Sequence, residues 1–355
     1  MSERKLASVQ KIINISPIPN KDRIVLADIL GYHVIVSKED FKVGDLCVYI
    51  ECDSVLDPNN PIFEQARKRS SRIKTMKLGN TYSQGIAYPL SILGKGDWKE
   101  GDDVTAKLKI TKYDEYGDNA DFAKVSNLSK KKYNKFQLLW FKLFGFPQRK
   151  KGGFTSLVSK TDETRIQNIP EVLQNKEPMT VSQKIDGTSC TLTLERTFFG
   201  TKFNVYSRNL RIGKDNSAYW QIVEMYDLED RMGLMMEELN VPWVAIQGEI
   251  AGPGIQKNPL KLKEIDFFVF NIITPKGRFG NKEMVEICYR YGLTTVPIMS
   301  YDYILPDTVD QLLKYATGPS FVNPEVLREG VVIRSQDGKY SFKAVSPEYL
   351  IRHDK

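Results

Sequence analysis

Cysteine and histidine are scarce in this sequence of 355 residues, which has four cysteines and two histidines. No two cysteines form a Cys-x-x-Cys pair, so the spacing gives no sign of a structural zinc site. Four thiols are also too few for a disulfide framework in a chain of this length, and we expect an intracellular, reducing compartment. Nothing in the sequence distinguishes an organelle from the cytoplasm.

Long hydrophobic runs are absent as well. The most apolar stretch, residues 136–146 (FQLLWFKLFGF), is too short to cross a bilayer and contains Lys142. The N-terminal residues MSERKLASVQKII contain no hydrophobic core of a secretory signal. We therefore expect no membrane partner, and we interpret residues 136–146 as a packed helix, a lid or a docking segment.

The composition is that of a folded chain, with 41% hydrophobic and 27% charged residues. The length allows about two domains of roughly 100–200 residues each. The formal net charge of +7 suits a polyanionic partner such as nucleic acid. Many proteins without such a partner have a similar charge, so the charge alone decides nothing.

The pattern of residues changes along the chain. The first hundred or so residues contain short runs rich in β-branched and aromatic residues, separated by turn signals, which predicts a small barrel or sandwich. Residues 113–135 are highly charged and form the best linker candidate. From residue 154 onward, predicted strands mix with helices, including one over 217–239, which is an α+β pattern. We place the boundary so that residues 1–125 form one domain and residues 126–355 the other.

Basic clusters occur in both parts. The densest comprises Arg67, Lys68, Arg69, Arg72, Lys74 and Lys77, with Tyr82 nearby, and others lie at Lys130–Lys132 and Arg149–Lys151. Each cluster is either a solvated surface or a track for RNA phosphates. The sequence alone leaves both interpretations open.

The segment Gln183-Lys184-Ile185-Asp186-Gly187 carries the clearest chemical signal. In a strand, Lys184 and Asp186 would point to the same face, and Gly187 would let the backbone turn or approach a ligand closely. An amine would then lie beside a carboxylate able to hold a divalent cation. Such a Lys-x-Asp-Gly pattern arises by chance in about one chain in ten of this length, so it needs support from other motifs.

That support comes from further segments in a fixed order. They are Lys160–Asn168, Ser207-Arg208-Asn209, Gln247-Gly248-Glu249-Ile250, residues 266–271 (DFFVFN), Glu329–Ile333 and Ser341-Phe342-Lys343-Ala344. Taken singly, each has an ordinary explanation. Glu249 could be an exposed edge residue, Phe268 and Phe270 could pack in the core, and Glu329 and Lys343 could form a simple salt bridge.

Taken together, the segments resemble the motifs of the covalent nucleotidyltransferase superfamily, which contains DNA ligases, RNA ligases and mRNA capping enzymes. Their order resembles that of the RNA ligase 5 family. The resemblance implies an α+β protein with an N-terminal OB-fold β-barrel, followed by an ATP-grasp-like nucleotidyltransferase domain of antiparallel sheets and helices. It also implies an ATP-dependent RNA ligase that acts as a monomer and joins RNA 3′-OH and 5′-phosphate ends, with a nicked duplex as the expected substrate.

The same resemblance implies the roles of individual residues. Lys184 would become adenylylated, and Lys343 would contact the α-phosphate. The ATP site would further contain Lys160, Arg165, Gln183, Arg208, Glu249, Phe268 and Phe270, with Lys160 and Arg165 at the β and γ phosphates and one of the two phenylalanines stacked on adenine. Asp186, Glu249 and Glu329 would hold Mg²⁺ or Mn²⁺, mostly through water. We further expect the cation and Lys343 to lower the pKa of Lys184.

Two other classes of protein have to be weighed. A DNA ligase or capping enzyme would share the lysine chemistry, but those families place the OB domain after the last motif, and only 12 residues follow Lys343 here. An OB-fold protein that binds tRNA or other RNA without catalysis would explain the first 110 or so residues. It would leave Lys184, Glu249 and Glu329 without a purpose.

Overall fold

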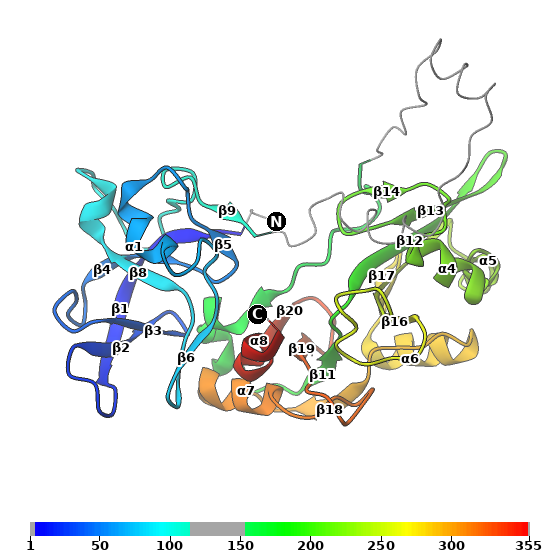
Figure 1. The fold of residues 1–355 in the computed structure, drawn as a ribbon. Coiled ribbons are helices and arrows are strands. Elements are labelled where there is room, and N and C mark those ends of the chain that lie inside the picture. The colour runs from blue at the N-terminus through cyan, green and yellow to red at the C-terminus, as the bar shows by residue number, and fades with distance from the viewer. Residues whose placement is uncertain (1–3, 114–152, 354–355) are drawn as a thin grey trace, which may run out of the picture.

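The computed structural model describes residues 4–113 and 153–353, and these form two parts that lie side by side (Figure 1). The N-terminal part, drawn in blue and cyan, is mostly β-structure, whereas the C-terminal part combines sheets with helices. The predicted boundary at residues 125 and 126 lies outside the described residues. The same is true of the apolar stretch 136–146 and of the basic clusters Lys130–Lys132 and Arg149–Lys151.

The N-terminal part is built around a five-stranded antiparallel sheet with the strand order β3-β2-β1-β4-β8. Its elements are β1 (Ala7–Pro17), β2 (Ile24–Ile29), β3 (Tyr32–Ser37), β4 (Leu46–Ile50), β5 (Ser54–Val55), α1 (Glu64–Arg67), β6 (Met76–Leu78), β7 (Thr81–Ser83), β8 (Ile86–Pro89) and β9 (Thr111–Lys112). Burial alternates residue by residue along β2 and β3, as expected for strands with one face on a core. Separate apolar clusters form around Val9, Val48 and Phe63 and around Ile12, Tyr32 and Tyr49.

The C-terminal part contains two sheets. One has the order β10-β20-β19-β11-β18 and the other the order β14-β13-β12-β15-β16-β17. The strands are β10 (Thr164–Arg165), β11 (Met179–Lys184), β12 (Thr188–Thr197), β13 (Gly200–Tyr206), β14 (Arg211–Ile212), β15 (Trp243–Ala251), β16 (Asp266–Thr274), β17 (Gly277–Arg278), β18 (Ile298–Tyr303), β19 (Gly330–Ser335) and β20 (Ser341–Val345). The sheets are antiparallel apart from the short parallel pair β10 and β20, so the first of them is mixed.

Helices complete this part of the molecule. They are α4 (Ala218–Met225), α5 (Leu228–Glu238), α6 (Asn281–Arg290), α7 (Val309–Ala316) and α8 (Pro347–His353). The single helix predicted over residues 217–239 was wrong, because Asp227 adopts a left-handed backbone with φ of 46° and separates α4 from α5. These two helices and α6 pack on the six-stranded sheet, and α7 packs on the other one.

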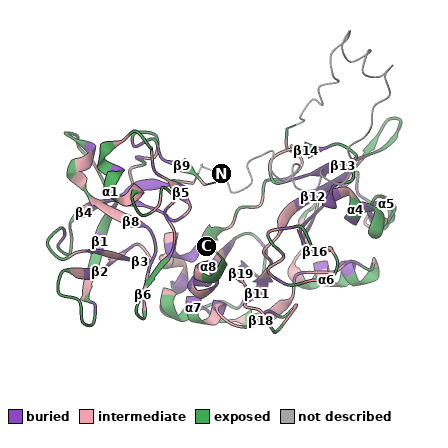
Figure 2. Ribbon diagram, viewed as in Figure 1, coloured by how far each residue is buried: buried purple, intermediate pink, exposed green. Residues whose placement is uncertain are grey.

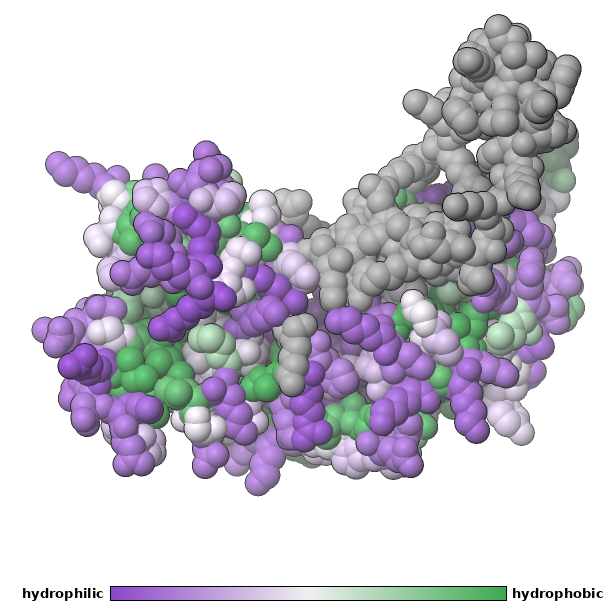
Figure 3. Space-filling view, in the orientation of Figure 1, coloured by the Kyte–Doolittle hydropathy of each residue, from purple (hydrophilic) through white to green (hydrophobic). Residues whose placement is uncertain are grey.

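Buried side chains concentrate in the sheets, and the outward faces of α5 and α6 are exposed (Figure 2). Hydrophilic side chains cover much of the visible face, with apolar patches between them (Figure 3). Among the described residues, no helix is long and apolar enough to span a membrane. The four cysteines are all buried and all unpaired.

Polar contacts join the two parts. The backbone N–H of Gly31 donates to the carbonyl of Gln167 at 2.7 Å, and Asn168 donates to Glu51 at 3.1 Å. Close to these contacts, the Arg165 guanidinium donates to Asp53 at 3.2 Å. Gly31 allows this approach, because a Cβ there would lie 2.8 Å from Gln167 Cα. The short segment 165–168 therefore contributes several contacts between the two parts, and His33 adds another by pairing with Asp310 at 3.0 Å.

Candidate active site

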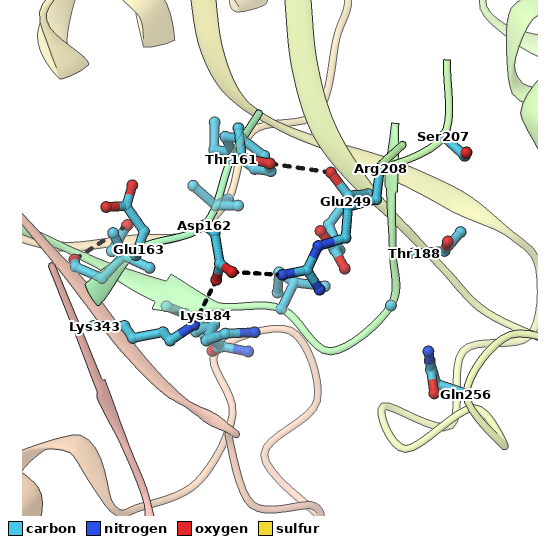
Figure 4. Close-up of a pocket in the computed structure, with 18 of the residues that line it drawn as sticks. Thr161, Asp162, Glu163, Lys184, Thr188, Ser207, Arg208, Glu249, Gln256 and Lys343 are labelled. Atoms are coloured by element: carbon cyan, nitrogen blue, oxygen red, sulfur yellow. Dashed lines mark hydrogen bonds and ion pairs between the residues drawn. The ribbon is translucent and has the colours of Figure 1, made fainter. Parts of the chain in front are cut away.

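A cavity of about 540 Å³ opens between the two sheets of the C-terminal part, within the usual size range for small-molecule sites (Figure 4). Its lining includes Lys184, Arg208, Glu249, Phe270 and Lys343. These five residues belong to five of the segments that the sequence analysis singled out. The fold thus brings together side chains up to 159 positions apart in the sequence.

Lys184 is the last residue of β11, and its ammonium donates to Glu329 Oε2 at 2.6 Å. Burial acts against the charged form, but Glu329, Glu249 and Asp186 outweigh it and raise the pKa of Lys184 above its ordinary value. The protein's own side chains thus raise this pKa, because acids, rather than Lys343, dominate the surroundings of the amine. The lowering of this pKa by a bound cation together with Lys343 stays a prediction.

The carboxylates around Lys184 come from different elements. Glu249 lies on β15, Glu329 directly precedes β19, and Asp186 lies in the short connection after β11. Burial is the main cause that raises the pKa of Glu249 to about 8. Burial is also the main cause that raises the pKa of Glu329 above its ordinary value. Glu329 and Asp186 also act to raise the pKa of Glu249, so the three acids crowded around one lysine disfavour one another's charged forms.

The segment from Lys184 to Gly187 crosses from one sheet to the other, since β11 and β12 belong to different sheets. Asp186 therefore lies in this crossing and not in a strand, and the strand-alternation argument for it was wrong. A Cβ on Gly187 would lie 2.2 Å from the carbonyl oxygen of Ile250 and 3.0 Å from Glu249 Cγ. Glycine is thus required here by the close passage of the chain against β15.

A second charged centre, around Asp162, also lines the cavity. The Asp162 carboxylate accepts from Arg208 at 2.8 Å and from Lys343 at 3.2 Å, and Lys112 lies 3.8 Å away (Figure 4). Burial acts against the charged carboxylate, but the three cations prevail and hold the pKa of Asp162 at about 2. Burial in turn lowers the pKa of Lys343 to about 8. Three cations from three elements thus converge on one anion.

The structure places the predicted residues Arg165, Lys160 and Gln183 differently with respect to the cavity. The structure does not bring Arg165 to the cavity lining, because its side chain is only 8% exposed and its guanidinium faces Asp53. Lys160 donates to Asn209 at 2.9 Å, next to the cavity. Gln183 lines the cavity, but its amide group is engaged by Ser320 at 2.9 Å and by the backbone N–H of Phe321 at 2.6 Å.

The structure separates the two candidate phenylalanines on β16. Phe268 is 3% exposed and packs in an apolar cluster with Ile185 and Val296. Phe270 is half-buried and lines the cavity. Of the two phenylalanines, only Phe270 lines the cavity, and stacking on adenine stays a prediction for it.

In the basic cluster of the N-terminal part, some side chains make contacts within their own domain. Arg67 donates to backbone carbonyls of its own domain, and Arg72 pairs with Asp53 at 2.7 Å and stacks on Tyr113 at 3.9 Å. Lys77 lies 5.1 Å above the ring of Tyr82. Arg67 and Arg72 thus support the domain itself, and the interpretation as an RNA track stays a prediction for the remaining residues.

Sequence reasoning missed several residues near the site. Lys112 reaches the cavity from the N-terminal part, and Tyr349 on α8 donates to Asp186 Oδ2 at 2.6 Å. Asp162 was noticed only as part of a longer segment. No spacing in the sequence links these residues to Lys184, because their proximity follows from the docking of separate elements.

The chemistry of the acids suits a divalent cation. Oxygen ligands of this kind are those that Mg²⁺ and Mn²⁺ prefer. Within residues 4–113 and 153–353, however, no group of three acidic, cysteine or histidine side chains is close enough to bind one ion directly. An ion held by Asp186, Glu249 and Glu329 mostly through water stays a prediction.

Comparisons with known proteins agree with this architecture. An OB-fold domain model matches residues 6–90, which confirms the predicted OB-fold, and an RNA ligase model matches residues 177–345. No curated protein sequence matches the chain. Fold and site together define a protein with an N-terminal OB-fold and a nucleotidyltransferase-type domain.

Solved structures of Naegleria gruberi RNA ligase match over almost the whole chain. A mutant of that enzyme with ATP and Mn is 30% identical and has a TM-score of 0.81, with 99% of this chain and 100% of that chain covered. An apo mutant is 30% identical, with a TM-score of 0.82 and coverage of 100% and 99%. A mutant with AMP and Mn is 30% identical, with a TM-score of 0.80 and coverage of 99% of each chain. The chain belongs to the RNA ligase family.

Proposed function

We propose that this protein is an ATP-dependent RNA ligase that forms a covalent lysyl-AMP intermediate on Lys184. The observation that carries the proposal is the position of Lys184 in the lining of a cavity, with its amine 2.6 Å from Glu329 and with Lys343, Arg208 and Lys112 in the same lining. A nucleophile in one cavity with a set of cations is the arrangement that nucleotidyl transfer from a polyphosphate needs. The related Naegleria gruberi structures that contain ATP or AMP support the choice of nucleotide.

In the proposed first step, the Lys184 amine attacks the α-phosphorus of ATP. A phosphorus–nitrogen bond forms, the bond to the bridging oxygen breaks, pyrophosphate leaves, and the amine loses a proton. Lys343 and Arg208 would offset the negative charge of the reacting phosphates, and Phe270 would stack on the base. Asp186, Glu249 and Glu329 would hold a Mg²⁺ or Mn²⁺ ion, which supplies positive charge to the phosphates when bound.

AMP would then pass to the 5′-phosphate of an RNA strand. A 3′-hydroxyl would attack that activated phosphate, release AMP and leave a phosphodiester. We propose RNA ends held together in a nicked duplex as the substrate, in keeping with the net charge of +7 and the N-terminal OB-fold. Positioning and charge neutralisation account for the catalysis in each step.

Labelling with [α-³²P]ATP tests the first step. The protein should become labelled through a bond that resists alkali and breaks in acid, as a phosphoramidate does. Lys184→Ala should abolish the label, whereas Lys202→Ala, which removes a lysine on the exposed end of β13, should retain it. A label that persists in Lys184→Ala contradicts the assignment. Absence of label in the wild-type protein, despite RNA binding, favours the non-catalytic alternative.

Nick sealing tests the substrate. Duplexes with a single nick should be prepared with RNA or DNA on each side of the break and a 5′-phosphate or 5′-hydroxyl at the end. Sealing should require the 5′-phosphate and an RNA strand. Equal sealing of all-DNA nicks would contradict the choice of RNA.

We also propose that the protein acts as a monomer in a reducing compartment. The second point is supported by the four cysteines, which are all buried as free thiols. Light scattering after size exclusion measures the first point. For the second point, the source cells are lysed in the presence of an alkylating reagent. The cysteines of the denatured protein that were alkylated as free thiols are then counted.

A further inference from the structure

The C-terminal helix α8 reaches the acids around Lys184 through one buried side chain. Tyr349 is 3% exposed, and its hydroxyl donates to Asp186 Oδ2 at 2.6 Å. Its ring stacks on His353, with ring centroids 4.1 Å apart. The tyrosine is thus fixed by its helix while its hydroxyl points at the carboxylate two residues after the nucleophile. In Figure 1 this helix, drawn in red, lies between the two parts of the molecule.

The start of α8 is attached to a second acid of the site. The backbone N–H of Ser346 donates to the carbonyl oxygen of Glu329 at 2.8 Å. The Ser346 hydroxyl oxygen accepts from the backbone N–H of Tyr349 at 3.2 Å and from Thr317 at 2.9 Å. Ser346 itself is fully buried. The helix therefore contacts Asp186 through a side chain and Glu329 through the backbone.

We propose that Tyr349 is a positioning residue for lysine adenylylation, which it serves by fixing the orientation of the Asp186 carboxylate. The inference rests on the proposed function. Asp186 lies in the crossing between two sheets, outside β11 and β12, and Tyr349 reaches it from a separate helix. A hydrogen-bond donor to one carboxylate oxygen restricts rotation of the carboxylate. It thereby fixes the direction in which the second oxygen points. Small errors in the placement of such groups cost large factors in rate.

The test compares two tyrosines that each lose a hydroxyl. Tyr349→Phe keeps the stacked ring and removes only the donor to Asp186. Tyr340→Phe is the matched control, because its hydroxyl accepts from Asn175 at 2.6 Å in a contact outside the cavity lining. We expect single-turnover adenylylation to slow about tenfold to hundredfold in Tyr349→Phe, as for a lost hydrogen bond to a charged group, and to stay near wild type in Tyr340→Phe.

A double-mutant cycle separates positioning from general stabilisation. If Tyr349 acts through Asp186, Tyr349→Phe should have no further effect in an Asp186→Ala background. Equal slowing in both backgrounds, or no slowing in either, overturns the inference. Melting temperatures of all variants show whether the fold is retained, and the comparison between backgrounds holds even where stability falls.

A binding measurement supplies a readout apart from turnover. Mn²⁺ titrated by electron paramagnetic resonance into the Lys184→Ala protein with ATP should bind several-fold more weakly after Tyr349→Phe, and this difference should vanish in Asp186→Ala. Unchanged Mn²⁺ binding overturns the inference. If the wild-type protein forms no lysyl-AMP, the proposed function fails. If it does so while Tyr349→Phe matches Tyr340→Phe, only the role of Tyr349 fails.

Discussion

The Asp162 carboxylate lies among three cations, and on the proposed function these cations bind the phosphates of ATP, so removing the carboxylate should strengthen the binding of phosphates. Arg208, Lys343 and Lys112 lie 2.8, 3.2 and 3.8 Å from its carboxylate. In Asp162→Asn the side chain keeps its shape and loses its charge. The three cations would then be available to an incoming anion.

The size of the effect follows from the exposure of the group. The Asp162 side chain is 40% exposed, so solvent screens its ion pairs, and each is worth roughly 0.2–1 kcal/mol. Three pairs together give about 1–2 kcal/mol, which corresponds to about five- to thirtyfold in affinity. The appropriate ligand is inorganic pyrophosphate, because it carries the phosphate charge without the base.

Isothermal titration of pyrophosphate into the Lys184→Ala protein measures this affinity. Asp162→Asn should bind about five- to thirtyfold more tightly than its parent, and the gain should shrink as salt is raised. Asp302→Asn, at the exposed position of the otherwise half-buried strand β18, is the matched control and should leave the affinity unchanged. Equal or weaker binding in Asp162→Asn would refute the view that this carboxylate competes for the cations.

Three further predictions follow from the same structure. Gly187→Ala should slow adenylylation about a hundredfold, because the added Cβ would lie 2.2 Å from a backbone oxygen of β15 and displace the crossing segment; single-turnover labelling measures this. Phe270→Ala should weaken ATP binding about two- to tenfold with little change in melting temperature, as expected for a lost stacking contact. Hydrogen bonds to Asp310 and Asp28 raise the pKa of His33 from 6.5 to about 9, so their stabilisation is complete below pH 6.5 and is lost as the pH rises through 9. In the wild-type protein, the melting temperature should therefore fall as the pH rises through 9, and His33→Gln should lack the His33 contribution to this fall. A pH profile of the melting temperature that is unchanged in His33→Gln would contradict the assignment.

The sequence predicted the parts of this protein that depend on local pattern. Period-two burial along β2 and β3 follows from alternating residues, and the motif segments supplied Lys184, Glu249 and Lys343, all of which line one cavity. Such features are readable because each is set by a few neighbouring residues. The order of the segments then sufficed to name the family.

Features set by docking could not be predicted from the sequence. Arg165 contacts Asp53, which lies 112 positions away in the other part of the molecule, and nothing near either residue marks the pair. Lys112 comes to the cavity from the N-terminal part, and Tyr349 comes to Asp186 from the last helix, for the same reason. The raised pKa of Lys184 likewise depends on acids assembled by separate strands.

The crossing between the two sheets has a consequence for how the enzyme is held together. Glu249 belongs to a strand of one sheet, Glu329 adjoins a strand of the other, and Lys184 ends a strand that is followed by only three residues before the next sheet begins. Neither sheet alone carries a complete set of reacting groups. Any change that slides or separates the two layers will therefore alter the nucleophile-to-acid spacing directly, even where every side chain of the site is intact.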